Sequence, residues 1–206
     1  FFFKQKTAYE ILACLEFRRV LFRSDPRIGP YFLSASPGFG GSCFEKDLRL
    51  LCQLAKALGQ TEVAAYWQSV LEMNNAHIRQ VARVISKAAG HGGRVAVFGL
   101  AFKGGVKDLR SSPSLRVADI LKTAGHPVAA YDPQVFRAKG VKVRRSPAAA
   151  AGGAKVIAVL TNDRLFRRLD WPALSRRGAK VYDAHGIVAD RLSAAGRLIS
   201  IGRGIR

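Results

Sequence analysis

The spacing of hydrophobic residues changes near residue 90. Before that point apolar residues recur every three or four positions, which is typical of amphipathic helices. One such stretch runs from about Phe44 to Gly59, and its apolar face comprises Leu48, Leu51, Cys52, Ala55 and Leu58. A second helix is predicted from about residue 61 to 89, with an apolar stripe of Val63, Trp67, Val70, Leu71, Ile78, Val81 and Ile85. A helix of roughly 28 residues spans about 40 Å, long enough for a domain spine or a dimer face.

After residue 90 short apolar runs alternate with helical segments. Strands are predicted within residues 94–102, 126–133, 155–163 and 179–187, and shorter ones at 141–143 and 198–202. Helices are predicted at 112–125, weakly at 146–154, and at 165–176. Such alternation favours a parallel sheet covered by helices. We therefore expect an α/β protein with a helical segment, 25–90, followed by a Rossmann-like parallel-sheet domain, 91–206.

The first 24 residues differ in character from the rest. They scatter Lys and Arg throughout and include Glu10 and Glu16, so they fit neither a signal peptide nor a transit peptide. The stretches FFFKQKTAYEI and LEFRRVLFRS are similar to translated sequencing-adapter sequence. We expect residues 1–24 to be an artefact or disordered; a genuine amphipathic helix is the alternative.

The net charge favours an anionic partner. The 206 residues carry 34 Lys and Arg against 14 Asp and Glu, a net charge of +20. Residues 1–24 hold five of the basic and two of the acidic residues, so residues 25–206 keep +17. The basic residues are spread over many segments and no nucleic-acid-binding motif is present, so we expect no nucleic-acid partner.

Other classes are excluded by composition. No apolar run approaches the ~18 residues that a membrane span needs. The three cysteines form no CxxC pair and the four histidines lack metal-ligand spacing, so we expect no membrane partner, no disulfide framework and no metal. A reducing compartment, the cytoplasm, is the expected location.

Cys43 is the leading candidate for chemistry. It follows the glycine-rich segment 36–42, whose backbone can bend tightly, and it precedes a predicted helix, whose N-terminus favours a thiolate. Lys46 adds a positive charge, and Asp47 lies one helical turn away. This pattern fits covalent catalysis by a thiol with a neighbouring carboxylate, although a buried structural cysteine is the alternative. Cys52, on an apolar face, is predicted to be core.

Two segments carry a resemblance to a known family. RIGPYFLSASPGFGGSCFEKD, residues 27–47, resembles the active-site segment of UDP-glucose 6-dehydrogenases and related nucleotide-sugar dehydrogenases. FGLAFKGGVKDLRSSPS, residues 98–114, resembles the segment that opens the same family's C-terminal domain, which binds UDP-sugar. Weaker similarity lies in YDP, LTND and the final IGRG, so the resemblance covers residues 25–206.

The resemblance implies an activity and a set of site residues. Members of the family oxidise a sugar 6-hydroxyl to a carboxylate with two NAD, through a cysteine thiohemiacetal and thioester. Cys43 matches the thiol and Asp47 the acid/base residue, while Lys46 and Arg110 match cofactor contacts. Arg27 matches a residue that reaches the partner subunit's site in a homo-oligomer. The positions that match substrate contacts are Arg27, Phe32, Leu33, Phe39, Gly40, Phe44, Phe102, Lys103 and His185.

The sequence also departs from the family pattern. Glu45 stands where Pro is usual, Ser111 where Glu is usual, and His185 where Arg is expected. UDP-glucose is the expected substrate, with other UDP-sugars and GDP-mannose left open.

The family's NAD-binding domain, with its GxGxxG turn, has no counterpart in these 206 residues. We therefore expect a C-terminal part of a larger enzyme that is inactive alone. A stand-alone UDP-sugar-binding or scaffold protein is the alternative.

Overall fold

The computed structural model describes residue 26, residues 35–188, residue 192 and residues 198–199. The chain divides into two compact units, residues 1–35 and 36–206, and the fold described below belongs to the second. The expectation for residues 1–24, and the predicted site residues Arg27, Phe32 and Leu33, lie outside the described residues.

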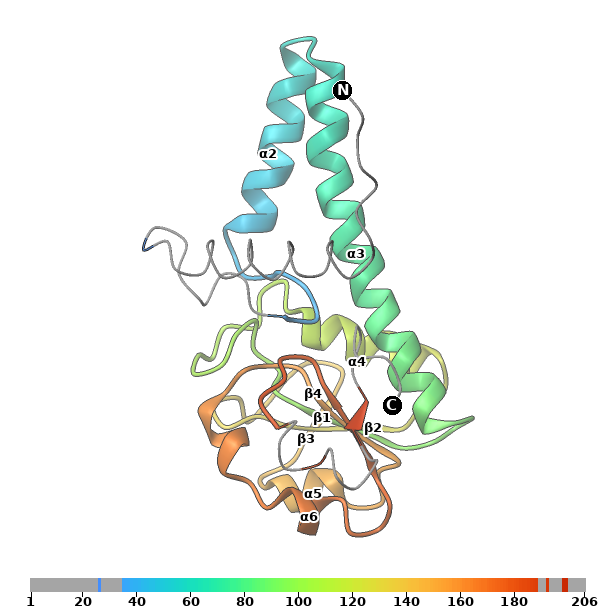
Figure 1. The fold of residues 1–206 in the computed structure, drawn as a ribbon. Coiled ribbons are helices and arrows are strands. Elements are labelled where there is room, and N and C mark those ends of the chain that lie inside the picture. Colours follow the sequence, from blue (N-terminus) through green and yellow to red (C-terminus); the bar gives the residue numbers. More distant parts are fainter. Residues whose placement is uncertain (1–25, 27–34, 189–191, 193–197, 200–206) are drawn as a thin grey trace, which may run out of the picture. The chain divides into compact units, whose positions relative to one another are not determined.

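Helices α2 (Phe44–Ala57) and α3 (Thr61–Ala89) form an antiparallel hairpin (Figure 1). Both predicted helices are thereby confirmed. Their mutual contact buries Leu48, Cys52 and Leu71. The predicted apolar faces are wider than the real ones, because Leu51, Leu58 and Val63 are exposed. A helix that packs on a single neighbour buries only the narrow stripe that faces it.

Six parallel strands form one sheet, which confirms the predicted fold class. The strands are β1 (Val95–Phe98), β2 (Val128–Tyr131), β3 (Lys142–Val143), β4 (Val156–Val159), β5 (Lys180–Asp183) and β6 (Leu198–Ile199). Their order is β3-β2-β1-β4-β5-β6, and every pairing is parallel. This is the Rossmann order, in which the winding reverses between β1 and β4.

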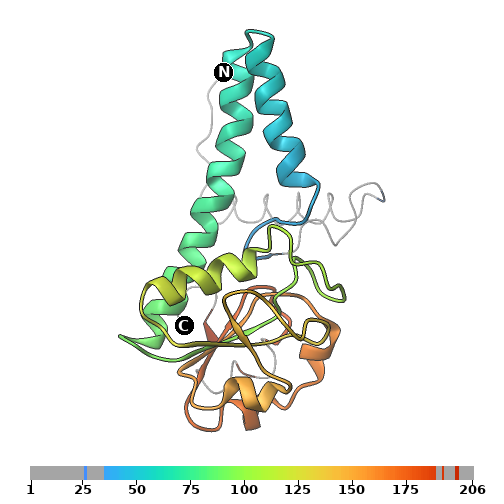
Figure 2. The ribbon, with the colours of Figure 1, turned by 180° about the vertical axis from the view of Figure 1, so that it is seen from behind.

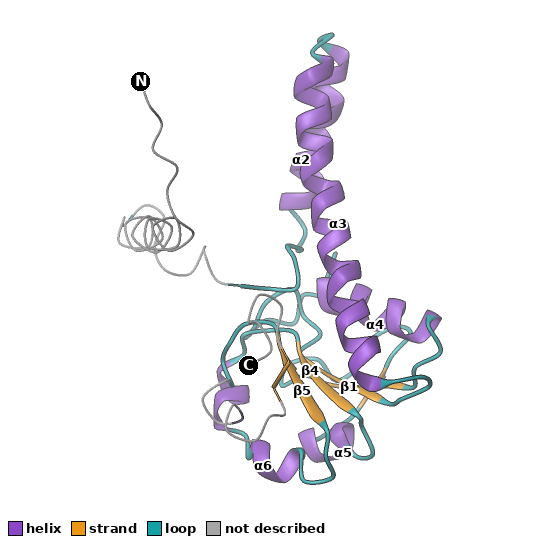
Figure 3. Cartoon of the chain, turned by 45° about the vertical axis from the view of Figure 1, so that its right-hand side comes forward, coloured by secondary structure: helices purple, strands orange, loops and turns teal. Residues whose placement is uncertain are grey.

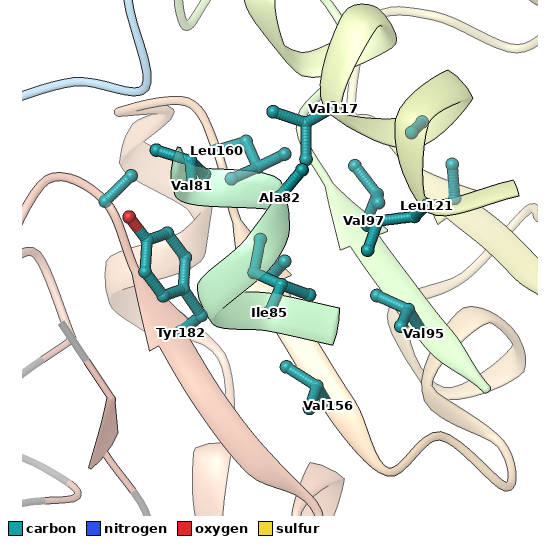
Figure 4. Close-up of a cluster of buried hydrophobic side chains, with 14 of the residues drawn as sticks. Val81, Ala82, Ile85, Val95, Val97, Val117, Leu121, Val156, Leu160 and Tyr182 are labelled. Carbon is teal, nitrogen blue, oxygen red and sulfur yellow. The ribbon is translucent and has the colours of Figure 1, made fainter. Parts of the chain in front are cut away.

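Alternate residues of each central strand face different helical layers. Val95 and Val97 of β1 pack against Val81 and Ile85 of α3 and against α4 (Pro113–Thr123), as Figure 4 shows. Ala96 and Phe98 point to the other face, which is covered by α5 (Pro147–Ala151), the 3-10 helix η1 (Arg164–Arg168) and α6 (Trp171–Leu174). The views of Figures 2 and 3 show α5 and α6 across the sheet from α4. Burial on both faces explains why β1 and β4 are continuously apolar.

The single helix predicted at residues 165–176 is wrong, because the segment divides into η1 and α6. Leu169 is extended, with φ −69° and ψ 148°, and this ends η1. The Asp170 side chain then accepts a hydrogen bond from the Ala173 amide and starts α6, which has Pro in its first turn. An acidic N-cap followed by proline is a helix-start signal, so the break was encoded locally.

A glycine comparison tests the close contact between β1 and β4. A Cβ at Gly99, where φ is +89°, would lie 2.0 Å from Oγ1 of the buried Thr161. A Cβ at Gly105, where φ is +77°, would meet nothing within 4 Å. We expect Gly99→Ala to lower the free energy of unfolding by about 2 kcal/mol more than Gly105→Ala, because only the former overpacks the core. Urea unfolding of both variants measures this difference, and equal losses would contradict the packing.

Candidate functional site

Cys43 occupies the N-cap position of α2, and its side chain is exposed. Its carbonyl accepts the Asp47 amide at 2.8 Å, and its Sγ lies 3.5 Å from the Ser42 hydroxyl. The Lys46 ammonium lies 3.5 Å from the Asp47 carboxylate. The predicted trio of Cys43, Lys46 and Asp47 is thus placed together at the start of α2. The buried Cys52, by contrast, belongs to the core as predicted.

The segment before Cys43 is bound to α3 by Asn74 and by His77, whose Nε2 lies 2.9 Å from the Ser36 carbonyl oxygen. The Asn74 Oδ1 accepts the Phe39 amide at 3.0 Å, and the Asn74 Nδ2 donates to the Phe39 carbonyl at 3.1 Å. Asn74 is buried, so this paired bond replaces its lost contacts with water. Sequence reasoning missed this residue. The available signal was a polar side chain three residues after Leu71 and four before Ile78, within an otherwise apolar stripe.

The same segment lies against the loop between β1 and α4. The Gly41 amide donates to the Arg110 carbonyl at 3.1 Å. A Cβ on Gly40 would lie 2.2 Å from the Ser111 carbonyl oxygen, and one on Gly41 would lie 3.2 Å from the Phe102 ring. Side chains are therefore excluded here, and the backbone leading to Cys43 contacts the loop directly. Three predicted site residues take part in this contact. Gly40 lies in the segment before Cys43, and Phe102 and Arg110 lie in the loop.

Arg110 is an exposed cation held by Asp108. Its Nη2 lies 2.7 Å from the Asp108 Oδ2 and its Nε 3.0 Å from Oδ1. The hydrogen bonds from Arg110 lower the pKa of the Asp108 carboxyl to about 2, and the carboxylate raises the pKa of Arg110. The electrostatic effect of Cys43 also raises the pKa of Arg110, and it is the smallest of the causes. A fixed, solvent-facing guanidinium can bind phosphate in a bidentate manner.

Two predicted aromatic contacts, Phe39 in this segment and Phe44 just after Cys43, pack against each other. The rings of Phe39 and Phe44 meet edge to face, with centroids 4.7 Å apart. The Lys103 ammonium lies 5.4 Å from the centroid of Phe102. Phe44 and Lys103 are both exposed, so they are available to a ligand.

The carboxyl ends of β1, β4 and β5 are joined by hydrogen bonds. The Gly104 amide donates to the Asn162 Oδ1 at 3.1 Å, and the Gly105 amide donates to the Asp163 Oδ2 at 3.0 Å. The His185 Nε2, just after β5, lies 3.2 Å from the Leu160 carbonyl oxygen. In doubly wound sheets ligands bind at this edge, where the winding reverses. The predicted contacts Lys103 and His185 both follow strands at that edge.

Comparisons with known proteins agree with this arrangement. Residues 96–190 match the UDP binding domain of the UDP-glucose/GDP-mannose dehydrogenase family, and residues 19–76 match the family's central domain. The chain belongs to this family. Its members are dehydrogenases, so the sequence resemblance is confirmed at the level of family and oxidoreductase class.

Similar proteins include several UDP-glucose 6-dehydrogenases. The chain is 36% identical to UDP-glucose 6-dehydrogenase 2 of Oryza sativa subsp. japonica, over 87% of this chain and 44% of the relative. It is 34% identical to the Bos taurus UDP-glucose 6-dehydrogenase, over 76% of this chain and 36% of the relative. It thus spans less than half the length of these relatives.

A solved structure shares the fold. The UDP-glucose dehydrogenase of the archaeon Pyrobaculum islandicum superposes with a TM-score of 0.74 at 27% identity. The matched region is 90% of this chain and 42% of the archaeal chain.

Two further properties concern the described part of the chain. No helix in it is both long and apolar enough to cross a membrane. Nor does it contain a group of three or more His, Cys, Asp or Glu residues that could hold a metal ion.

Cysteine labelling tests the placement of the thiol. Cys43 is exposed and Cys52 is 4% exposed, so iodoacetamide should modify Cys43 at least about tenfold faster in the folded chain. Peptide mass spectrometry distinguishes the two sites, and urea should equalise their rates. Cys43→Ser serves as the control for site assignment. Equal labelling without urea would contradict the burial of Cys52.

Removal of Arg110 should release the Asp108 carboxyl. In Arg110→Ala the pKa of Asp108 should rise from about 2 toward its ordinary value, because the largest cause of the lowering is lost. Carboxyl ¹³C chemical shifts followed from neutral to acid pH measure this change. Arg49→Ala, which removes a guanidinium paired with Glu45 instead, should leave Asp108 unchanged. An unchanged Asp108 in Arg110→Ala would overturn the assignment.

Proposed function

We propose that this chain supplies the catalytic thiol and the UDP-binding domain of an NAD-dependent UDP-glucose 6-dehydrogenase, which converts UDP-glucose to UDP-glucuronate. One observation carries the proposal. The backbone before the exposed Cys43, which stands at the N-cap position of α2, contacts the Phe102–Arg110 loop, which follows β1 at the carboxyl edge of a Rossmann-like sheet. A nucleophile beside a nucleotide-binding edge suits the oxidation of a nucleotide-linked sugar.

Cys43 is assigned the covalent step. Once the 6-hydroxyl has been oxidised to an aldehyde, the thiol sulfur adds to the carbonyl carbon and the carbonyl oxygen takes a proton. Loss of the hydride from the carbon and of the proton from the hydroxyl group of this thiohemiacetal gives a thioester. Water then attacks the thioester carbon, the carbon–sulfur bond breaks, and the thiol is restored as the carboxylate leaves.

We assign to Asp47 the removal of a proton from the water that attacks the thioester. Its carboxylate lies one helical turn beyond Cys43 and is exposed, so water reaches it. The Lys46 ammonium lies 3.5 Å from this carboxylate, and an ionised carboxylate is the form that accepts a proton.

The cofactor is assigned to the exposed cations beside the thiol. Bound NAD would supply the hydride acceptor for the two oxidations, one molecule for each. Lys46 and Arg110 are both solvent-facing and near Cys43, so they fit contacts to cofactor phosphates. Because the 206 residues contain no GxGxxG turn, we propose that a domain outside them holds most of the cofactor.

The UDP-sugar is assigned to the sheet edge and the glycine-rich segment. Lys103 provides a cation for phosphate, while Phe102, Phe39, Gly40 and Phe44 would surround the sugar and nucleotide. His185 replaces an expected arginine at the edge of β5, so a different UDP-sugar or GDP-mannose is the second candidate substrate.

A homodimer through the helical hairpin is part of the proposal. The hairpin leaves large apolar side chains exposed on both helices, and a second copy of the chain would cover them. These residues are Leu50, Leu51, Leu54, Leu58, Tyr66 and Met73.

Binding of UDP-glucose to this chain should depend on Lys103 and not on the thiol of Cys43. In calorimetric titrations with UDP-glucose, Cys43→Ser should keep the affinity within about twofold, because the thiol acts on the sugar only after oxidation. Lys103→Ala should weaken binding by about tenfold through loss of a charged phosphate contact. Lys56→Ala, which removes an exposed lysine far along α2, is the matched control.

Four outcomes would count against the proposal. Formation of NADH by the purified chain would overturn the expectation that it is inactive alone. Tighter binding of GDP-mannose than UDP-glucose would move the substrate to the second candidate. Undiminished turnover in a full-length Cys43→Ser enzyme would show that Cys43 does not carry the covalent step, and equal loss of binding and turnover would favour a structural role for Cys43.

A further inference from the structure

The loop that follows β1 carries two of the assigned ligand contacts. Residues 100–105 form this β1 loop, and Phe102 and Lys103 lie at its middle. Lys103 is exposed, and its ammonium lies 5.4 Å from the centroid of the Phe102 ring. A flexible loop would lose conformational entropy when these side chains bind a ligand, so the groups that hold the loop in place affect binding.

Asp132 holds the start of the β1 loop. It directly follows β2, is 4% exposed, and accepts the Leu100 amide at 2.7 Å and the Ala101 amide at 3.3 Å, both on its Oδ2. Its Oδ1 accepts the Gln134 amide at 2.8 Å and the Val135 amide at 3.0 Å, within its own turn. Backbone amides thus occupy both oxygens of this carboxylate, as a polar group removed from water requires.

The bonding of Asp132 excludes a direct contact with a nucleotide. In dinucleotide-binding folds an acidic residue that follows the glycine-rich turn in sequence hydrogen-bonds a ribose of the cofactor. Asp132 is buried and its oxygens face amides of the chain itself, so they are not open to a ligand. Any effect of Asp132 on a ligand therefore passes through the β1 loop.

Residues from the other neighbouring strand hold the end of the β1 loop. Asn162 and Asp163 follow β4, which pairs with β1 on the side away from β2. The Asn162 Oδ1 accepts the Gly104 amide at 3.1 Å, and the Asp163 Oδ2 accepts the Gly105 amide at 3.0 Å. A Cβ on Gly104 would lie 2.6 Å from the Asp163 amide nitrogen, so the two backbones pack directly against each other. The loop is therefore held at both ends, from β2 and from β4.

We propose that Asp132 and Asn162 are positioning residues, which hold the two ends of the β1 loop so that Phe102 and Lys103 face a ligand in a fixed arrangement. The use of this arrangement for a UDP-sugar rests on the proposed function, but the hold on the loop does not. Each residue acts on the ligand contacts through backbone amides of the loop.

Amide exchange in the 206-residue chain tests the hold on the loop. The Phe102 amide donates to the Asp108 carbonyl at 3.1 Å, so it reports the shape of the loop without bonding to either positioning residue. The Lys155 amide, which donates to the Arg94 carbonyl at 2.8 Å, reports the amino edge of the sheet. In Asp132→Asn an NH₂ group replaces one oxygen, and the remaining oxygen stays with the local turn. NMR-detected exchange at Phe102 should become about tenfold faster, while exchange at Lys155 stays within about twofold.

Asp183→Asn is the matched control. Asp183 is 3% exposed, and it accepts the backbone amides of His185, Gly186 and Val188 at the end of β5. The two aspartates are thus alike in burial and in bonding, but the donors to Asp183 lie outside the β1 loop. This substitution should leave exchange at Phe102 within about twofold of the wild type.

A second variant decides the question if Asp132→Asn does not fold. Asn162 is exposed, so Asn162→Ala leaves the core intact. Loss of its bond to the Gly104 amide should speed exchange at Phe102 by about threefold and leave exchange at Lys155 unchanged.

A double-mutant cycle tests whether the hold serves Lys103. In calorimetric titrations with UDP-glucose, Asp132→Asn should weaken binding by about fivefold in the wild-type chain. The same substitution should weaken binding by less than twofold in Lys103→Ala, because the effects of residues that act through one group are not additive. A merely structural role of Asp132 would weaken binding equally in both backgrounds.

The outcomes for the loop are separate from those for the function. Faster exchange at Phe102, with Lys155 unchanged and with no effect in Asp183→Asn, supports the hold. Unchanged exchange at Phe102, equal changes at Phe102 and Lys155, or the same effect in Asp183→Asn would overturn it. Additive losses in the cycle would overturn the action through Lys103. The exchange measurements contain neither UDP-glucose nor NAD, so normal binding by Lys103→Ala would count against the proposed function and leave the hold standing.

Discussion

The packing of α3 onto the sheet determines where the thiol stands. Val81 and Ile85 are fully buried against β1 and β4, and the same helix continues without a break to Asn74, which holds the segment before Cys43. A continuous helix is stiff over this distance, so its seat on the sheet is transmitted to the helical hairpin. The position of the thiol relative to the carboxyl edge of the sheet is thus set through α3, although the thiol and the sheet lie in different parts of the sequence.

The site itself is assembled largely from backbone. Gly40 and Gly41 let the main chain contact the Ser111 carbonyl and the Phe102 ring, and no side chain intervenes. Cys43, Lys46 and Arg110 face solvent around this contact. The thiol is therefore exposed, while the backbone that precedes it is packed against the loop.

Local patterns predicted most of the fold, and non-local contacts account for what they missed. Continuous apolar runs identified the central strands because both faces of the sheet are covered, and Ser112 with Pro113 marked the start of α4. The exposure of Leu58 depends on what packs beside the hairpin, which periodicity does not contain. Likewise the apolar periodicity of α3 does not reveal that Asn74 binds the backbone of Phe39, which lies 35 residues earlier in the sequence.

The outermost strand beyond β2 has a consequence for self-association. β3 contains only Lys142 and Val143, and Arg144 and Arg145 follow it directly. So short a ladder offers few free amide and carbonyl groups to an incoming strand, and the like charges of two such edges repel each other. Growth of the sheet by edge-to-edge addition is therefore disfavoured on this side, which protects a highly cationic chain from fibril-like stacking while it folds.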